Sequence, residues 1–483
     1  MAKTWEAVIG LEVHAELKTK TKIFCSCAAD FGALPNTNVC PVCMGLPGAM
    51  PSLNRHAVEL AIRAGLALGC EISHCSGIDR KQYFYPDLPK GYQISQDATP
   101  LCKNGVLHFS LDGEERSVGI SRIHIEEDAG KLIHEGAQSL IDFNRCGVGL
   151  IEIVSEPTVR SASEAAAYLR ALRSVLLACG VSDCRMQEGS LRCDVNVSVR
   201  PNGSSAMGVR TEIKNLNSFS FAEKAIAYEI ERQIAKKEAG EELEPETRRY
   251  DAVEGKTVRM RAKETSVDYR FLPEPDLTPI HVTEEAIEAI RRGLPELPEQ
   301  RKKRFVRDCR LTEYDASVLV SDPSLADYFE LAMRDCAYPK LCANLLLTDL
   351  LRVCRSDPFS CPVLPAGLGA LASLLGEGTI NSATAKKLLA RMTKENIDPR
   401  ETVTREHLMQ IRDRDQLTAL IDEVIQANQQ AVSDYRGGKT AALRALQGRV
   451  MAKTGGRADP ILTEQLLLSA LSANEESSKQ EVL

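Results

Sequence analysis

The chain of 483 residues lacks any apolar stretch near the ~20 residues that a membrane-spanning helix requires. It also lacks the layout of a signal peptide, because charged and polar residues interrupt the apolar ones in the N-terminal MAKTWEAVIGLEVHAEL. No internal repeat or low-complexity tract is present. These absences exclude a membrane span and favour a globular protein, and we expect it in the cytoplasm, without a membrane partner.

An excess of positive charge is also missing. The formal net charge is −7, whereas a protein that binds nucleic acid through its overall charge is basic. Any contact with nucleic acid must therefore be local, and we expect no DNA partner.

A P-loop is the third absence. Two GKT tripeptides begin at Gly255 and Gly438, but the leading glycine of the P-loop pattern is replaced by Tyr250 and Ser433. If the protein uses ATP, another kind of site must hold the phosphates.

Short strand-like runs separated by turn residues fill the chain up to Gly293. Two helices interrupt them: one follows Ser161 and Glu164, which form a capping-box pattern, and the other carries apolar residues at i, i+4 spacing from Ala222. This pattern predicts an α+β domain on a largely antiparallel sheet. After the break at Gly293 the pattern is nearly all helical, with a second break at residues 399–407.

The segment SRIHIEEDAGK, residues 121–131, ends a predicted strand with three adjacent acids, Glu126, Glu127 and Asp128. Adjacent carboxylates repel each other, and their burial costs free energy unless cations compensate them. Two interpretations are open: a strand end in solvent, or a site for a divalent metal ion.

Other predicted strands repeat this feature, since GLEVHAEL, LIEIV and LRCDVNVSV also place acidic or polar residues on one face. Carboxylates combined with an imidazole suit Mg²⁺ or Mn²⁺, and such sites commonly serve phosphoryl transfer. A solvated polar face remains the alternative for each strand. The positions concerned, besides the acid run, are Glu12, His14, Glu16, Glu152, Arg192, Asp194, Asn196 and Ser198.

Basic and aromatic residues cluster in RKQYFYPDLPKGYQISQ, from Arg80, and in KETSVDYRFLPEPD, from Lys263. Such loops can bind phosphates and stack on a base, although ordinary proline-rich loops with exposed cations remain the alternative. We predict ATP or substrate binding by Lys81, Tyr83, Tyr85, Lys90, Arg192, Asn196, Lys263 and Arg270.

The chain contains 16 cysteines, of which most are scattered singly. We expect these, Cys354 among them, to be small buried residues rather than disulfide partners. Four others form two close pairs, Cys25–Ser26–Cys27 and Cys40–Pro41–Val42–Cys43, which match a tetrahedral zinc site. The second pair is a strong zinc signal and the first a less usual one, and four unrelated thiols are the alternative. With four cysteine ligands no position is open for water, so the predicted zinc is structural.

Taken together, these segments resemble the B subunits of the tRNA-dependent aspartyl/glutamyl amidotransferases along essentially the whole chain. The resemblance implies a catalytic cradle domain similar to the glutamine synthetase core at 1–293, with the zinc loop near 25–43, a helical domain at 294–403 and a YqeY-like tail at 404–483. The motifs that carry it are VIGLEVHAEL, DRKQYFYPDLPKGYQISQ, RIHIEEDAGK, LIEIVSEP, EGSLRCDVNVS, KNLNSF and YRFLPEPD.

The resemblance implies an activity: ATP phosphorylates the side-chain carboxylate of misacylated Glu-tRNA(Gln) or Asp-tRNA(Asn), and ammonia displaces the phosphate. The metal positions of the family match Glu12, His14, Glu126 and Glu152, with Glu127 beside them, and Asp194 and Glu127 are candidates for the base. No glutaminase nucleophile is recognisable, which fits a family in which an amidase-type A subunit supplies ammonia and a small C subunit completes a heterotrimer.

The resemblance also implies a tail that contacts tRNA. Between residues 431 and 457 the only acid is Asp434, and a solvated helix face is the alternative for each cation there. Two further alternatives are a glutamine-synthetase-type ligase acting on a free small molecule and a non-catalytic tRNA-binding scaffold. The basic residues predicted to contact tRNA are Arg436, Lys439, Arg444, Arg449 and Lys453.

Overall fold

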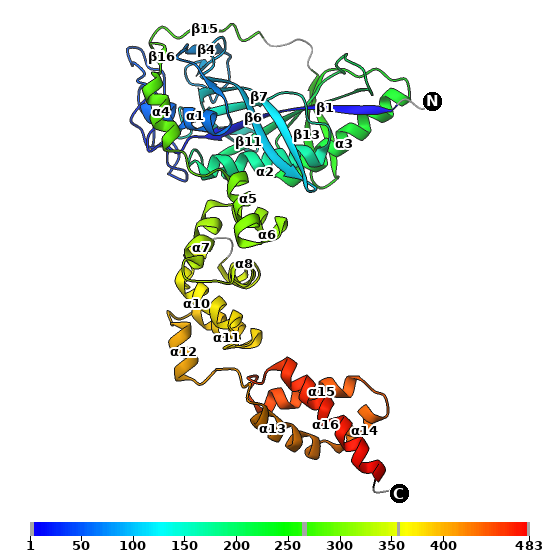
Figure 1. The fold of residues 1–483 in the computed structure, drawn as a ribbon. Helices are drawn as coiled ribbons and strands as arrows, with labels where there is room; N and C mark the ends of the chain where they lie inside the picture. The colour runs from blue at the N-terminus through cyan, green and yellow to red at the C-terminus, as the bar shows by residue number, and fades with distance from the viewer. Residues whose placement is uncertain (1–3, 263–267, 355–357, 481–483) are drawn as a thin grey trace. The chain divides into compact units, whose positions relative to one another are not determined.

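The computed structural model describes residues 4–262, 268–354 and 358–480 (Figure 1). The chain divides into two compact units, Met1–Arg301 and Lys302–Leu483. This division falls inside helix α5 (Pro298–Cys309), later in the chain than the predicted boundary at Gly293. The assignment of three functional domains remains a prediction.

The first unit is built on a nine-stranded sheet, in which β1 is the central strand (Figure 1). Its pairs are antiparallel except β12–β13, which confirms the predicted α+β class with a largely antiparallel sheet. In spatial order the strands are β14 (Lys256–Ala262), β13 (Glu246–Asp251), β12 (Thr211–Lys214), β11 (Leu191–Pro201), β1 (Trp5–Glu16), β10 (Gly149–Ser155), β7 (Glu114–Glu127), β6 (Cys102–Leu111) and β2 (Glu71–Ile72).

Strand β1 alternates strictly in its second half, with Leu11, Val13 and Ala15 buried and the intervening residues only partly buried. The buried face contributes to one continuous core shared with helices α1 (Arg55–Ala67), α2 (Ala162–Ala178) and α3 (Phe219–Glu238). The helices therefore cover the apolar face of the sheet, and the polar face is left for a site.

The predicted cap of α2 is confirmed, since the Ser161 hydroxyl accepts a hydrogen bond from the backbone N–H of Glu164 at 3.1 Å. A bulge interrupts the β10–β7 pairing between Val154 and Ser155. There the Ser155 hydroxyl accepts a hydrogen bond from the Leu11 N–H at 2.9 Å, so a side chain satisfies a donor of β1 where the ladder is irregular.

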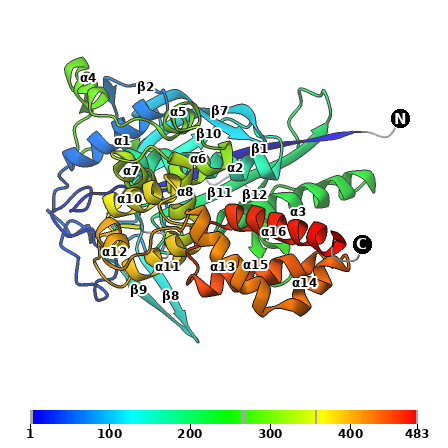
Figure 2. The same ribbon diagram turned by 60° about the horizontal axis from the view of Figure 1, so that its bottom comes forward.

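Three small sheets and helix α4 (Glu284–Arg292) complete the unit. The two-stranded hairpin of β8 and β9 extends away from its body (Figure 2). The small sheets are β15 (Leu272–Pro273) with β4 (Asp79–Gln82) and β5 (Tyr92–Ser95), β16 (Ile280–His281) with β3 (Cys75–Ser76), and β8 (Lys131–Glu135) with β9 (Gln138–Asp142).

The described part of the second unit is helical and has two separate hydrophobic clusters, one before and one after the segment 406–413. The predicted break at 399–407 is misplaced at its start, because Pro399 occupies the first turn of α12, where proline is tolerated. The helices are α6 (Glu313–Val320), α7 (Pro323–Met333), α8 (Pro339–Asn344), the π-helix η1 (Leu345–Leu350), α9 (Leu351–Cys354), η2 (Pro358–Ser360), α10 (Pro365–Gly376), α11 (Ser382–Met392), α12 (Pro399–Arg405), α13 (Arg414–Ala427), α14 (Gln429–Arg436), α15 (Ala441–Lys453) and α16 (Pro460–Gln480).

One expectation about cysteine is wrong: Cys354 forms a disulfide with Cys361. Its apolar helical surroundings suggested a free buried thiol, because the partner lies beyond the end of the helix, where the local pattern carries no information. Among the described residues, no helix combines the length and the apolar character needed to cross a membrane.

Candidate functional site

Strands β1, β7 and β10 bring one histidine and two acids together on the polar face of the sheet. His14 pairs with Glu152 in the β1–β10 register, and its Nε2 lies 3.2 Å from Glu152 Oε2 and 3.4 Å from Glu126 Oε1. His124 approaches the same two carboxylates at 3.6–3.7 Å. His14, Glu126 and Glu152 place one ligand atom each within 4.8 Å of one another, and we call them the histidine cluster.

The positive charge of His14 and the negative charges of the two carboxylates stabilise each other. Burial lowers the pKa of His14, but the hydrogen bond to Glu152 and the charges of Glu126 and Glu152 outweigh it and raise the pKa to about 9. Burial raises the pKa of Glu152, but the hydrogen bond from His14 holds it well below its usual range. The two carboxylates therefore stabilise the protonated form of His14 between them.

A second group of acids lies beside the first, across the β1–β11 pair. Glu12, Asp194 and Glu212 also place ligand atoms within 4.8 Å of one another, and we call them the acid cluster. Lys214 Nζ lies 2.6 Å from Asp194 Oδ2 and 3.1 Å from Glu212 Oε1. Burial raises the pKa of Glu12, and the charges of Glu152 and Asp194 raise it further. The sequence analysis had placed Glu12 in one set with His14, Glu126 and Glu152. In the structure Glu12 belongs instead to the acid cluster.

Glu212 was missed by the sequence analysis. It alternates with Thr211 and Ile213 in VRTEIKN, one of the short strand-like runs that precede Gly293. The alternation could have pointed to it, but only the pairing of β11 with β12 brings Glu212 to the polar face next to Asp194.

Both clusters line one cavity of about 600 Å³, which cationic side chains border. Three buried nitrogen atoms of its lining have no hydrogen-bond partner within the described ranges: Arg122 Nε, His124 Nδ1 and Arg192 Nε. Unsatisfied buried polar atoms are rare in folded proteins, and the two arginine nitrogens can only donate, so they favour a ligand with acceptor oxygens.

The acid run of SRIHIEEDAGK is not a solvated strand end. Glu126, Glu127 and Asp128 are only 3%, 2% and 3% exposed. Glu127 forms an ion pair with Lys90 and accepts a hydrogen bond from the Ile94 N–H at 2.8 Å.

Asp128 accepts a hydrogen bond from Arg192 at 2.7 Å. Each acid of the run therefore has its own cationic environment, and only Glu126 belongs to a candidate metal cluster.

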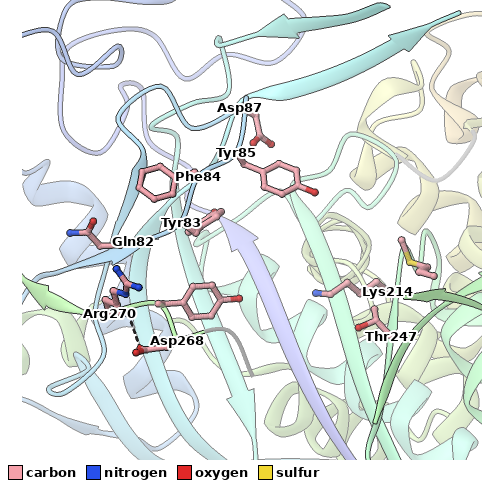
Figure 3. Close-up of a pocket in the computed structure, with 11 residues that line it drawn as sticks. Gln82, Tyr83, Phe84, Tyr85, Asp87, Lys214, Thr247, Asp268 and Arg270 are labelled. Carbon is pink, nitrogen blue, oxygen red and sulfur yellow. Dashed lines mark hydrogen bonds between the residues drawn. The ribbon is translucent and has the colours of Figure 1, made fainter. Parts of the chain in front are cut away.

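An aromatic pocket of about 800 Å³ adjoins the cavity, and Figure 3 shows Tyr83, Phe84 and Tyr85 on one side of it and Lys214 and Thr247 on the other. Tyr83, Tyr269 and Lys214 line both spaces. Lys81 Nζ lies 4.8 Å from the ring centre of Tyr269. The pocket can therefore accept a flat group at the edge of the acidic cavity.

Tyr85 and Arg270 line the aromatic pocket as well. Lys90 lines neither this pocket nor the cavity, since it points to Glu127, and Lys263 lies outside the described residues.

Asn196 lies in a different, smaller pocket of about 290 Å³, which meets the cavity at Glu12. Asn196 pairs with Gly10 in the β1–β11 register. A Cβ atom at Gly10 would have only Pro157 within 4 Å, at 3.7 Å, so the missing side chain leaves open space. Glycine in a strand interior commonly marks the close approach of a ligand to the backbone.

The four predicted zinc ligands come together. Cys43 Sγ lies 3.5 Å from Cys25 Sγ, 3.7 Å from Cys40 Sγ and 3.8 Å from Cys27 Sγ. Tetrahedral zinc with bonds of about 2.3 Å requires sulfur atoms about 3.8 Å apart, so this set of donors fits the ion. Hydrogen bonding with Cys25 and the charge of Lys22 lower the pKa of the Cys43 thiol to about 4, against the effect of burial.

The predicted tRNA-contacting residues are all exposed. Lys439 pairs with Asp434 at 3.0 Å, and Lys453 pairs with Glu423. Arg436, Arg444 and Arg449 have no ion pair in the part of the chain that the structure describes, so their charge is directed to solvent.

Comparisons with known proteins cover almost the whole chain. A family model described as the GatB/GatE catalytic domain matches residues 7–288, and one described as the GatB domain matches residues 327–471. The aspartyl/glutamyl-tRNA(Asn/Gln) amidotransferase B subunit from Carboxydothermus hydrogenoformans is 50% identical over 97% of this chain and 99% of its own length. Proteins of the same name from Moorella thermoacetica and Clostridium tetani are 49% and 47% identical over 97% and 98% of this chain, and 100% and 99% of their own lengths.

Proposed function

The chain belongs to the family of aspartyl/glutamyl-tRNA(Asn/Gln) amidotransferase B subunits, and on this basis we propose that it catalyses the ATP-dependent transamidation of Glu-tRNA(Gln), Asp-tRNA(Asn) or both. The observation that carries the proposal is the pair of candidate metal-binding clusters in one cavity, which adjoins a large aromatic pocket and a smaller pocket. Such an arrangement suits a reaction that joins two anionic substrates.

The reaction has two steps. First the γ-phosphoryl group of ATP moves to a side-chain carboxylate oxygen of the aminoacyl-tRNA, and ADP leaves. Ammonia nitrogen then attacks the acyl carbon, the bond to the phosphate oxygen breaks, and inorganic phosphate leaves with the electron pair. The nitrogen loses a proton, for which the sequence offered Asp194 and Glu127. Asp194 lines the cavity and is the proposed acceptor, whereas Glu127 is paired with Lys90 and does not line the cavity.

The two clusters are the proposed magnesium or manganese sites. His14, Glu126 and Glu152 would hold one ion, and Glu12 would hold a second with its neighbours in the acid cluster. Bound metal supplies the positive charge that brings phosphate and carboxylate together and stabilises the transition state.

We assign the small pocket to the base of ATP. The Asn196 carboxamide can pair with an adenine edge, and Gly10 leaves room for the ring. From there the phosphates would reach Glu12, which lies two residues from Gly10 on the same face of β1. Arg192 and Lys81, which line the cavity, would bind phosphate or carboxylate oxygens.

We assign the aromatic pocket to the terminal nucleoside of the tRNA. Tyr83 and Tyr85 would stack on its base, and Arg270 would contact its phosphate. Lys90, predicted from the sequence to bind substrate, would instead hold Glu127 in place.

We further propose that the chain acts in the cytoplasm, where it assembles with two partner subunits and binds tRNA through its tail. An amidase-type A subunit would supply ammonia, and a small C subunit would complete a heterotrimer. The tail, residues 404–483, would bind the tRNA backbone through its exposed cations, and zinc on the four cysteines would hold its loop without taking part in the chemistry.

The test uses the chain purified with A and C partners, Mg²⁺, ATP and Glu-tRNA(Gln), with ammonium chloride in place of glutamine. ADP release and conversion of tRNA-bound Glu to Gln are followed for wild type and Glu126→Gln. We expect both signals in the wild type and neither in the variant. Amide formation at the wild-type rate in Glu126→Gln would contradict the proposed metal site.

The same assay separates the alternatives. A ligase for free amino acids would keep its activity after RNase treatment, and a non-catalytic scaffold would release no metal-dependent ADP.

A further inference from the structure

Lys22 is buried, and none of the described carboxylates forms an ion pair with it. Its exposed fraction is 0%, and only one other lysine of the described residues, Lys302, is classed as buried. Its ammonium contacts two acceptors, Cys43 Sγ at 3.4 Å and the Phe143 carbonyl oxygen at 3.3 Å. Within the described ranges no ion pair with an acid is formed by Lys22, so its burial needs another explanation.

A buried ammonium is costly unless a negative charge compensates it. A single Cys43 thiolate supplies at most one negative charge, whereas zinc held by four thiolates is doubly negative and offers charged sulfur acceptors at every position. The four-cysteine cluster is the one group in contact with Lys22 that can supply this charge.

We propose that Lys22 is the positive charge that compensates the zinc–thiolate centre, by donating a hydrogen bond to the metal-bound sulfur of Cys43. This inference rests on the zinc site of the proposed function. The partner of a metal ligand commonly fixes the ligand's orientation and tunes metal affinity. Lys22 thus acts through Cys43 as a positioning residue and does not touch the metal.

The Lys22 ammonium also connects the zinc loop to the turn before β10. Its second acceptor, Phe143, begins a turn that leads into β10, and in this turn Gly147 donates a backbone hydrogen bond to the Asp128 carbonyl at 2.9 Å. Gly147 has a φ of +82°, and a Cβ atom there would lie 3.6 Å from Lys22 Cδ. Lys22 therefore lies between the zinc loop and the turn that holds the acid run at the end of β7.

The first test measures zinc affinity by chelator competition in wild type and Lys22→Met, which keeps most of the side-chain length and removes the charge. The matched control is Lys20→Met, because Lys20 is exposed and two residues away. We expect Lys22→Met to bind zinc roughly 10–100-fold more weakly and the control to match wild type.

The metal can also be replaced by cobalt, whose thiolate charge-transfer bands report the charge on sulfur. Removing the ammonium should move these bands to lower energy, an effect that a merely structural lysine would not produce. Wild-type zinc affinity and unshifted bands in Lys22→Met would overturn the proposal. Absence of zinc from the wild-type protein would overturn the zinc site as well, which distinguishes the two failures.

A second measurement needs no variant, in case Lys22→Met does not fold. Wild-type protein is treated with an amine-acylating reagent before and after zinc removal, and each lysine is followed by mass spectrometry. We expect Lys22 to be protected in the zinc form and acylated in the metal-free form, while Lys20 reacts in both. Equal protection of Lys22 in both forms would show that its burial does not depend on the metal, and would overturn the proposal.

Discussion

The two clusters of the cavity and the cysteine cluster are candidate metal sites of two kinds, built in opposite ways. The ligands of the cavity come from five strands, β1, β7, β10, β11 and β12, and they line an open space of about 600 Å³. The cysteines come from one stretch, 25–43, and would fill all four positions around a tetrahedral ion. The sheet site leaves room for substrates, whereas the loop site has none. Catalysis should therefore depend on the first and stability on the second.

The strongest test of this contrast is Glu152→Gln, which removes a charge and a ligand from the histidine cluster but keeps the side-chain shape. We expect kcat to fall about a thousandfold, or about 4 kcal/mol in activation free energy, with zinc content unchanged. Steady-state ADP release and metal analysis of the same sample measure both effects. Glu114→Gln, at the exposed start of β7, is the control. A zinc loss that parallels the activity loss would mean that the two sites are not independent.

A smaller effect on activity is expected from substitution of Gly10, which lies on β1 two residues before Glu12 and is not a proposed metal ligand. Gly10→Val fills the small pocket with a side chain, so KM for ATP should rise about tenfold, the effect of roughly 1.4 kcal/mol of lost binding. Gly10→Ala, whose Cβ meets only Pro157 at 3.7 Å, should change KM less. An equal rise of KM for aminoacyl-tRNA would contradict the assignment of this pocket to ATP.

The two sites should also respond differently to pH. Because the pKa of His14 is raised to about 9, the imidazole is protonated below that pH, and metal must displace the proton. Mg²⁺ affinity should therefore rise with pH, by at most about tenfold per unit, and level off above about 9. Isothermal titration between pH 6 and 9.5 measures it, with proton release as the second readout. A flat profile would remove His14 from the metal site.

The mildest effect on chemistry is expected from the cysteines. Cys40→Ser should lose zinc and lower Tm by roughly 5 °C, the shift that about 2 kcal/mol causes in a large domain. Below that Tm, kcat should stay within about threefold of wild type, because no ligand position of the zinc is open for chemistry. Thermal unfolding and ADP release at low temperature test this together, and a thousandfold loss of kcat would remove the contrast between the sites.

The loop-built site was easier to predict than the sheet-built one. Its four ligands form two pairs whose spacing alone suggests zinc, and their sulfur atoms lie together as expected. The period of two in β1 likewise predicted which face His14 occupies. Strand partners are not encoded in a local pattern, so the sequence did not reveal Glu212 or the separation of Glu12 from the histidine cluster.

The burial of the acid run could not be predicted from the sequence either. Glu127 and Asp128 could have been solvated, and it is Lys90 and Arg192, brought from distant segments, that make their burial possible. The aromatic residues of the two loops were identified as binding residues from composition. Their separation from Asn196 into a different pocket depends on three-dimensional arrangement alone.

The register of strand β1 fixes the spacing of two residues of the site. Glu12 and His14 are its successive positions on the polar face, and neighbours on both sides fix the register, so their Cα atoms stay about 7 Å apart whatever surrounds them. A substitution in β1 changes one side chain. The insertion or deletion of one residue would instead move every later side chain of the strand to the opposite face of the sheet. Natural variation in this strand should consist of substitutions, and length changes should be confined to the loops at its ends.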